Sequence, residues 1–352
     1  MSKMIPWNKK NKANRNKTVI PLMLVMLMLL LVLAVTVGAV HIPFGQALKV
    51  ILKKTGLLAN AKTTVNQESI IYLIRLPRVI VASLSGAALA TCGAVMQGMF
   101  RNPMADPGIL GVSSGAGLGA VTAIALGFSA QSIYFLPLFA SVGAIAAVGI
   151  IYVLSSRGGK IPTLTLILSG IAVSTFIGAI TQLVLVNSND YEVNTFIFWT
   201  MGGLNGMMWN QVKLITLPVI ILIIILVIFA RDLNILLLGE EEAQSLGLDP
   251  SKTRKLLLVL TSLTTAVAIS VSGPVSFVGL IVPHILRLIV GPDHRILIPA
   301  SAVGGAIFLV CCDIVGRVPP SGEIGVGIVT SLLGAPYFLY LLMKARKEGT
   351  VI

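Results

Sequence analysis

The sequence that comes closest to a catalytic motif lies at residues 154–161. The run Arg157–Lys160 has the glycines and the lysine of a phosphate-binding loop. The full pattern, GxxxxGK[ST], also needs a glycine at the position of Leu154 and a serine or threonine at the position of Ile161. No GxSxG or HExxH motif and no pair of carboxylates occurs where a pocket is expected. The sequence therefore predicts no catalytic residue and no ATP site in this chain.

Metal chemistry is not indicated either. Metal ligands would need clustered histidines or cysteines at CxxC-type spacing. The cysteines lie inside apolar segments and the histidines are scattered, at Cys92, Cys311, Cys312, His41, His284 and His294. We expect no metal site and no cofactor bound by this chain.

The composition of the chain is that of a membrane protein. Hydrophobic residues make up 56% of the chain and charged residues 11%, and the mean hydropathy is +0.95; soluble proteins have about 45–50% apolar and about 25% charged residues. A bilayer core of about 30 Å needs roughly 20 apolar residues per helix, and long continuous apolar runs favour helices over a barrel. We expect an all-α, polytopic fold with about ten transmembrane helices, at 18–40, 70–98, 112–127, 133–155, 162–186, 209–230, 254–272, 275–291, 296–316 and 323–343.

Basic residues set the expected orientation in the cell membrane. The segment 1–17 is rich in lysine and arginine, and the apolar run after it, from Pro21 to Val40, is too long for a signal peptide. With ten crossings, most of the 26 Lys and Arg residues fall on the side of this segment, so both termini are expected in the cytoplasm. The net charge of +13 is then a topology signal and an attraction to anionic lipid, and nucleic acid is not an expected partner.

Carboxylates at membrane depth would indicate a transporter driven by an ion gradient, because they are costly in lipid and are kept for function. Of the 13 acids, only Asp313 and Glu323 fall near this depth, on either side of the break at 318–320. Two such acids are weak support for proton coupling. Energy supplied by a partner protein is therefore favoured.

The segment Leu238–Leu248, with the sequence LGEEEAQSLGL, places three consecutive glutamates between two long apolar runs. Gly239 interrupts the preceding helix, the glutamates follow where the first turn of a helix favours negative charge, and Gly247 is at the expected C-terminal stop. We expect a short cytoplasmic helix. From composition alone it is either a solvated connector or a rigid docking element for a partner.

Four long blocks resemble a known family. They are RLPRVIVASLSGAALATCGAVMQGMFRNPMADPGILG at 75–111, LGEEEAQSLGL at 238–248, GPVSFVGLIVPHILRLIVGPDHR at 273–295 and GEIGVGIVTSLLGAPYF at 322–338. The chain resembles the FecCD-type permeases of ATP-binding-cassette (ABC) importers for ferric siderophores, haem and cobalamin, from about Arg75 to Lys344.

The resemblance implies a type II ABC importer permease that forms a homodimer of ten-helix subunits. It also implies a cytoplasmic ATPase dimer, which holds ATP and Mg, and an extracellular binding protein that delivers the substrate. The acidic segment then corresponds to the coupling helices that enter a cleft of the ATPase. The expected ATPase contacts are Glu240, Glu241, Glu242, Ala243, Leu246 and Gly247.

By the same resemblance, three arginines at the outer ends of predicted helices meet acidic residues of the binding protein. They are Arg75, Arg78 and Arg317, and their position runs against the positive-inside trend. The alternative is that they reach up to lipid phosphates.

A cytoplasmic gate is expected from Asn102, Met104 and Thr163, which lie where similar permeases narrow. The run 102–107 contains two prolines and cannot be regular helix, so its backbone should be buried in protein or line a cavity. The alternative is a loop that only caps a helix.

These expectations give one organisation: a basic cytoplasmic N-terminus (1–17), a single transmembrane permease domain (18–343) with cytoplasmic coupling helices (238–250), and a cytoplasmic C-terminal tail (344–352). The expected function is ATP-driven import of a ferric siderophore, with haem or cobalamin as the alternative. An ion-coupled transporter that depends on Asp313 or Glu323, and a membrane scaffold that transports nothing, are the competing classes.

Overall fold

The computed structural model describes residues 9–38, 40, 42–54, 56–58, 63–156, 162–319 and 322–347 of the chain. The predicted terminal segments lie partly outside these residues, at 1–8 and 348–352, as does the run 157–161. The regular structure of the described residues is entirely helical. Its elements are α1 (Lys9–Thr36), α2 (Phe44–Lys54), α3 (Val65–Glu68), the π-helical η1 (Ser69–Arg75), α4 (Leu76–Met99), the 3-10 turn η2 (Pro107–Leu110), α5 (Val112–Ala125), α6 (Phe128–Gln131), α7 (Phe135–Ser155), α8 (Thr163–Val186), α9 (Asp190–Thr200), α10 (Trp209–Ile228), α11 (Ala230–Leu236), α12 (Glu240–Ser245), α13 (Pro250–Ser272), α14 (Val278–Val290), α15 (His294–Arg317) and α16 (Val326–Lys347).

Ten of these helices correspond to the ten predicted spans, and the all-α prediction is confirmed. Within the described residues, eight helices are long and apolar enough to cross a membrane. The other two, α5 and α14, have 14 and 13 residues. At 1.5 Å per residue they are about 21 and 20 Å long, shorter than a bilayer core of about 30 Å.

The predicted spans at 112–127 and 275–291 thus correspond to helices that are shorter than the other eight. The backbone breaks directly before each short helix, at Gly111 (φ 70°) and at Phe277 (φ 68°). Irregular backbone at membrane depth must be enclosed by protein or line a cavity. Hydropathy reports that a segment is apolar, but it does not show where such a break falls.

The second predicted span also differs at its start. The helix is continuous over Val65–Met99, a stretch of 35 residues that joins α3, η1 and α4. The π-helical turn ends at Arg75, two residues before Pro77, which has no N–H to donate to the preceding turn. The helix is longer than a bilayer requires, so its first turns extend beyond the predicted start at residue 70.

Helix α4 is the centre of the bundle and packs against α10, α13, α14 and α15. Its glycines allow close approach, because a Cβ at Gly86 would collide with the backbone of Gly305, and a Cβ at Gly93 with the backbone of Gly279. Nearly all side chains of α4 are buried as a result. This helix is the rigid element that connects the two ends of the molecule.

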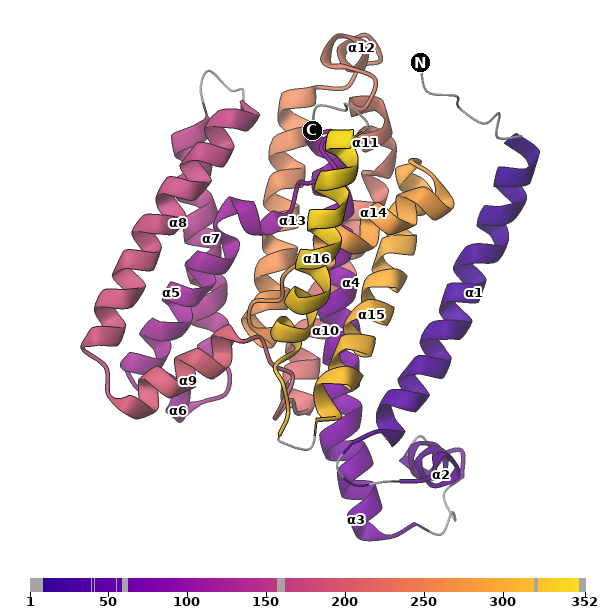
Figure 1. Ribbon diagram of the computed structural model, residues 1–352, viewed down its shortest axis with the longest axis vertical. Coiled ribbons are helices and arrows are strands. Elements are labelled where there is room, and N and C mark those ends of the chain that lie inside the picture. Colours follow the sequence, from indigo (N-terminus) through magenta and orange to yellow (C-terminus); the bar gives the residue numbers. More distant parts are fainter. Residues whose placement is uncertain are drawn as a thin grey trace.

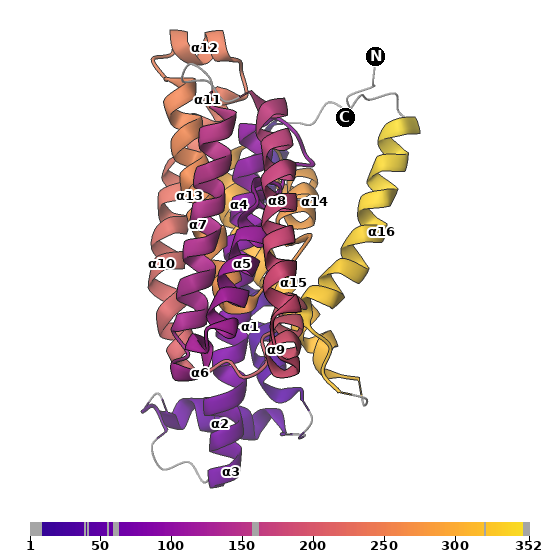
Figure 2. The same ribbon diagram turned by 90° about the vertical axis from the view of Figure 1, so that its left-hand side faces the viewer.

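The two ends of the bundle differ (Figure 1). Helix α12 projects from one end, whereas α2, α3, α6 and α9 lie at the other. The start of α1 and the end of α16 both lie at the end from which α12 projects. The topology prediction requires this, because it places both termini on the same side as the acidic segment. We therefore call the α12 end the inner end and the opposite end the outer end. Figure 2 shows that α16 leans away from the other helices toward the inner end.

Candidate functional site

The predicted coupling helix forms as expected at the inner end (Figures 1 and 2). Helix α12 is the six-residue Glu240–Ser245, preceded by Gly239 with φ 144°. At its C-terminus the N–H of Leu248 donates to the carbonyl of Ala243 at 2.9 Å, and the N–H of Gly247 donates to Gln244, also at 2.9 Å. These two bonds are the Schellman pattern, with Gly247 in the left-handed conformation it requires (φ 82°). The segment is therefore a defined structure and not a loose connector.

The three glutamates of α12 are not equivalent. Glu240 forms an ion pair with Arg254 of α13. The carboxylate of Glu242 folds back over Gly239, where a side chain would collide with it. Glu241 is exposed, and among the described residues its carboxylate has no hydrogen bond or ion pair. Of the acidic triplet, Glu241 is the carboxylate most open to a partner.

Ala243 does not fit its predicted role. Its side chain is fully buried beneath α12, so it supports the helix from below and cannot contact an ATPase in this conformation. The exposed apolar side chains of the segment are Leu238 and Leu246, which are 61% and 60% exposed. Leu246 was predicted as a contact, whereas Leu238 was not.

The end of the coupling segment is fixed by Asp249, the N-cap of α13. Its carboxylate accepts hydrogen bonds from the backbone N–H groups of Ser251 and Lys252, each at 3.1 Å. The bonds from the backbone and the side chain of Lys252 lower the pKa of Asp249. The carboxylate is therefore charged at neutral pH and caps α13 at the base of α12.

Helix α11 connects α12 to the bundle through polar contacts that sequence reasoning missed. The guanidinium of Arg101, at the end of α4, donates to the carbonyl of Leu236 at 3.1 Å. The side chain of Asn234 donates to Asp293 at 2.6 Å and accepts from the backbone N–H of His294 at 3.0 Å. Helix α11, which comes directly before α12, is therefore attached to the end of α4 and to the start of α15. In the sequence, Arg101 counted only as one of the basic residues that set the expected orientation, and Asn234 gave no signal.

The predicted gate loop is irregular, as its prolines required. The side chain of Asn102 accepts a hydrogen bond from the N–H of Met104 at 2.8 Å, and both residues are half-buried. Thr163 is the first residue of α8, but its side chain lies outside the described part. The local bond of Asn102 fits the alternative role of a capping loop. The gate formed by these three residues remains a prediction.

The three arginines lie at the outer end, as predicted, but they are buried. Arg75, Arg78 and Arg317 are 5%, 7% and 8% exposed. Arg78 donates to Asp313 at 2.9 Å and to Glu323 at 2.7 Å, and Arg317 forms an ion pair with Asp313. The two acids noted at membrane depth are therefore counter-ions of arginines. We call Arg78, Arg317, Asp313 and Glu323 the outer charge cluster.

Arg75 and Arg317 also hold the end of α1. Arg75 donates to the carbonyls of Val35 at 2.9 Å and Thr36 at 2.7 Å, and Arg317 donates to the carbonyl of Ala34 at 3.0 Å. The last carbonyls of a helix lack partners within the helix and carry partial negative charge. The two guanidinium groups therefore cap α1 at its outer end. Their binding-protein contacts remain a prediction, and in this conformation they have partners within the chain.

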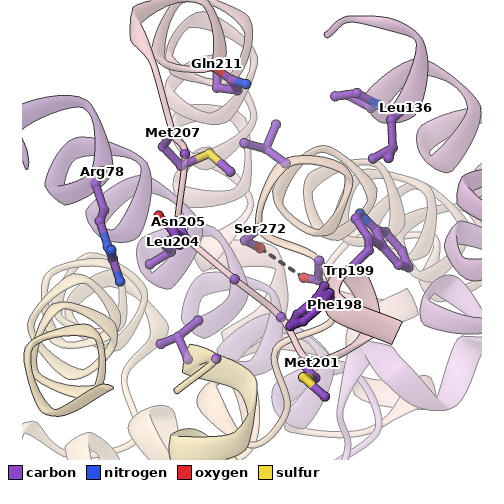
Figure 3. Close-up of a pocket in the computed structure, with 18 of the residues that line it drawn as sticks. Arg78, Leu136, Phe198, Trp199, Met201, Leu204, Asn205, Met207, Gln211 and Ser272 are labelled. Atoms are coloured by element: carbon purple, nitrogen blue, oxygen red, sulfur yellow. Dashed lines mark hydrogen bonds between the residues drawn. The ribbon is translucent and has the colours of Figure 1, made fainter. Parts of the chain in front are cut away.

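A cavity of about 660 Å³ lies beside the outer charge cluster. Figure 3 shows Arg78 and Trp199 on opposite sides of it, with Asn205 and Gln211 also at its wall. Glu323 lines the same cavity, and the indole N–H of Trp199 is buried without a hydrogen-bond partner. The outer end thus combines buried charges with open space next to them.

Comparisons with known proteins agree with this architecture. Residues 26–344 match the FecCD transport family. The chain is 50% identical over 274 residues, 78% of its length and 73% of the relative, to the cobalamin import system permease protein BtuC of Halobacterium salinarum. It is 41% identical over 280 residues, 78% of its length and 83% of the relative, to the hemin transport system permease protein HmuU of Yersinia pestis. A solved inward-facing structure of a metal-chelate type ABC transporter matches it with a TM-score of 0.82 and 29% identity, over 93% of this chain and 99% of that chain. This chain belongs to the FecCD transport family and is a membrane permease of an ABC importer.

Proposed function

We propose that this chain is the permease subunit of an importer that moves a large metal chelate into the cytoplasm, driven by ATP hydrolysis in a separate chain. The observation that supports this most is the inner end: a rigid, capped α12 presents Leu238, Glu241 and Leu246 to the cytoplasm. Ordering such a surface is useful when a partner binds it. The chain itself lacks a complete phosphate-binding loop, so the partner is expected to be the ATPase dimer that holds ATP and Mg.

Cobalamin is the substrate that the relatives favour. The relative with 50% identity is named for cobalamin and the one with 41% identity for hemin. The sequence-based expectation of a ferric siderophore belongs to the same class of large metal chelates, but neither of these relatives supports it. We therefore propose cobalamin as the first substrate to test, followed by haem and then ferric siderophores.

The proposed assembly contains two further partners. A second copy of the permease would complete the pathway. It or lipid would cover the exposed apolar faces of α8 and α16. These faces carry Leu164, Leu168, Ile171, Phe176, Leu183, Leu332, Leu333, Leu339, Tyr340 and Met343. A binding protein on the outer side would deliver the chelate, and its acidic groups would meet the arginines there. Both termini would then lie in the cytoplasm.

Uptake into proteoliposomes tests this function. Vesicles that contain the permease and its ATPase would receive the binding protein on the outer side of the permease and ATP on the side of α12. We expect ATP-dependent accumulation of labelled cobalamin above that of haem and ferric siderophores. A non-hydrolysable ATP analogue is the control and should prevent accumulation. Greater ATP-dependent accumulation of another chelate would change the proposed substrate but not the proposed function.

The competing ion-coupled mechanism gives the opposite result in the same vesicles. It requires a carboxylate that can bind and release a cation during transport. Asp313 is 1% exposed and lies between two guanidinium groups, which fits a structural counter-ion. Uptake driven by a proton or sodium gradient without ATP would overturn the proposed function.

A further inference from the structure

The accessible member of the outer charge cluster is an acid and not an arginine. The side chain of Glu323 is 41% exposed, whereas those of Arg78 and Asp313 are 9% and 1% exposed. A partner that approaches the outer end therefore meets a carboxylate before it meets the guanidinium of Arg78. A partner with acidic contact groups cannot use Arg78 until Glu323 has moved.

Arg78 has two carboxylate partners of different kinds. Its Nε and one terminal nitrogen both lie 2.9 Å from Asp313, and its other terminal nitrogen donates to Glu323 at 2.7 Å. Asp313 is fixed on α15 and is also held by Arg317. Glu323 comes from the irregular segment 322–325 before α16. The bond to Glu323 is therefore the one that can be exchanged while Arg78 stays in place.

Release of Glu323 would free the start of α16. Among the described residues, two backbone N–H groups of the segment 322–325 donate hydrogen bonds: that of Ile324 to Gly316 at 2.9 Å and that of Gly322 to Pro319 at 3.3 Å. In the first turn of α16, the N–H of Gly327 donates to Gly202 at 3.3 Å. The cavity of about 660 Å³ is lined by Arg78, Glu323 and Ile324, so it offers space for a displaced side chain. Helix α16 contacts α14 and α15 but lies at the edge of the bundle.

We propose that an acidic group of the binding protein displaces Glu323 from Arg78, and that this exchange releases the segment 322–325 and the outer end of α16. The proposal rests on the proposed function, because it requires a binding protein that docks at the outer end. Its physical basis is charge balance: Arg78 keeps two carboxylate partners before and after docking, so the exchange replaces one charged hydrogen bond with another. Arg75 cannot act in this way, because its bonds go to carbonyls of α1.

The substitution Glu323→Gln tests the exchange in the permease–ATPase complex, in nanodiscs of neutral lipid. The probe is the binding protein of the same importer. The amide binds Arg78 more weakly than the carboxylate does, so the binding protein has to break a weaker bond when it docks. We expect the affinity of the complex for the binding protein to rise about fivefold. This factor corresponds to about 1 kcal/mol, the contribution of a partly exposed ion pair. Asp190→Asn is the matched control, because Asp190 is an exposed acid at the outer end that contacts no arginine among the described residues. A general effect of removing negative charge near the outer end would change the affinity of both variants equally.

Hydrogen exchange supplies a second measurement that does not depend on affinity. In wild type, the binding protein should increase exchange at the amides of Ile324 and Gly327. In Glu323→Gln these amides should exchange faster already without the binding protein. Glu323→Asp keeps the charge and should behave like wild type in both measurements.

The outcomes separate the exchange from the function on which it rests. If the wild-type complex does not bind the binding protein at all, the proposed function fails. If it binds, but Glu323→Gln has wild-type affinity or the same gain as Asp190→Asn, the exchange is wrong and the function stands. Faster hydrogen exchange at the amide of Ile324 in anionic lipid, without the binding protein, would also overturn the proposed displacement by the binding protein, because a lipid headgroup would then be the displacing acid.

Discussion

Two ion pairs at opposite ends of the molecule differ sharply in their surroundings. At the inner end, Arg254 contacts Glu240, with side-chain exposures of 26% and 52%. At the outer end, Arg78 and Arg317 contact Asp313, and the three side chains are 9%, 4% and 1% exposed. Water can solvate the first pair if one partner is lost. Among the described residues, Asp313 is the one carboxylate that contacts Arg317, so losing Asp313 leaves that buried guanidinium without a counter-ion.

This difference separates two uses of charge in one permease. The inner ion pair connects α12 to α13 and is only partly buried, so little solvation is lost when it forms. It leaves Glu241, Leu238 and Leu246 free for a partner. The outer cluster joins α4 to α15 and to the segment before α16, whose carboxylates lie 235 and 245 residues further along the chain than Arg78. Inner charges thus lie beside the proposed contact surface for the ATPase, whereas outer charges hold the structure together and, in the proposed exchange, become available to a partner when Glu323 is displaced.

The largest effect is expected for Asp313→Asn. The substitution keeps the shape of the side chain and removes the charge that compensates Arg78 and Arg317. Breaking a buried ion pair in this way costs about 3–5 kcal/mol, so the variant should unfold at a clearly lower temperature or denaturant concentration in detergent. An Asp313→Asn protein as stable as wild type would contradict the role of Asp313 as the central counter-ion.

An intermediate effect is expected for Leu246→Ser at the inner end. Burying a leucine against a partner is worth about 1.5–3 kcal/mol, so association with the ATPase should weaken about tenfold or more. The stability of the isolated permease should stay unchanged, because Leu246 is exposed. Binding of the ATPase to the purified permease measures the first effect, and thermal unfolding measures the second.

Leu57→Ser is the matched control for this variant, since Leu57 is an exposed leucine at the outer end. It should not change ATPase binding. If Leu246→Ser binds as wild type does, while Glu241→Lys loses binding, the acidic triplet and not the apolar rim dominates the contact.

Much of this architecture could be predicted from the sequence because it depends on local patterns. Apolar runs located ten helices, and the glycines at 239 and 247 marked α12 within two residues of its bounds. The prolines at 103 and 107 showed that the gate loop is irregular. Each of these signals lies within one turn or one helix length of the feature it predicts.

The partners of the charges could not be predicted in this way. Arg78 and Asp313 are 235 residues apart in the sequence, and only the packing of α4 on α15 brings them together. The burial of Ala243 was hidden for another reason: a six-residue helix has too few positions for a periodic pattern that would show which face is inside. The arginines were placed at the correct end, but their exposure depends on neighbours that no local pattern identifies.

The smallest effect is expected for Glu240→Gln, the inner counterpart of Asp313→Asn. Exposed ion pairs contribute about 0–1 kcal/mol, because water replaces the lost partner and the two side chains regain conformational freedom. The free energy of unfolding should therefore change by less than about 1 kcal/mol, and the difference should shrink further at high salt. Unfolding of both amide variants under identical conditions measures this directly. A loss for Glu240→Gln that equals the loss for Asp313→Asn would show that burial does not distinguish the two pairs, and that α12 contributes to the stability of the fold as much as the outer charge cluster does.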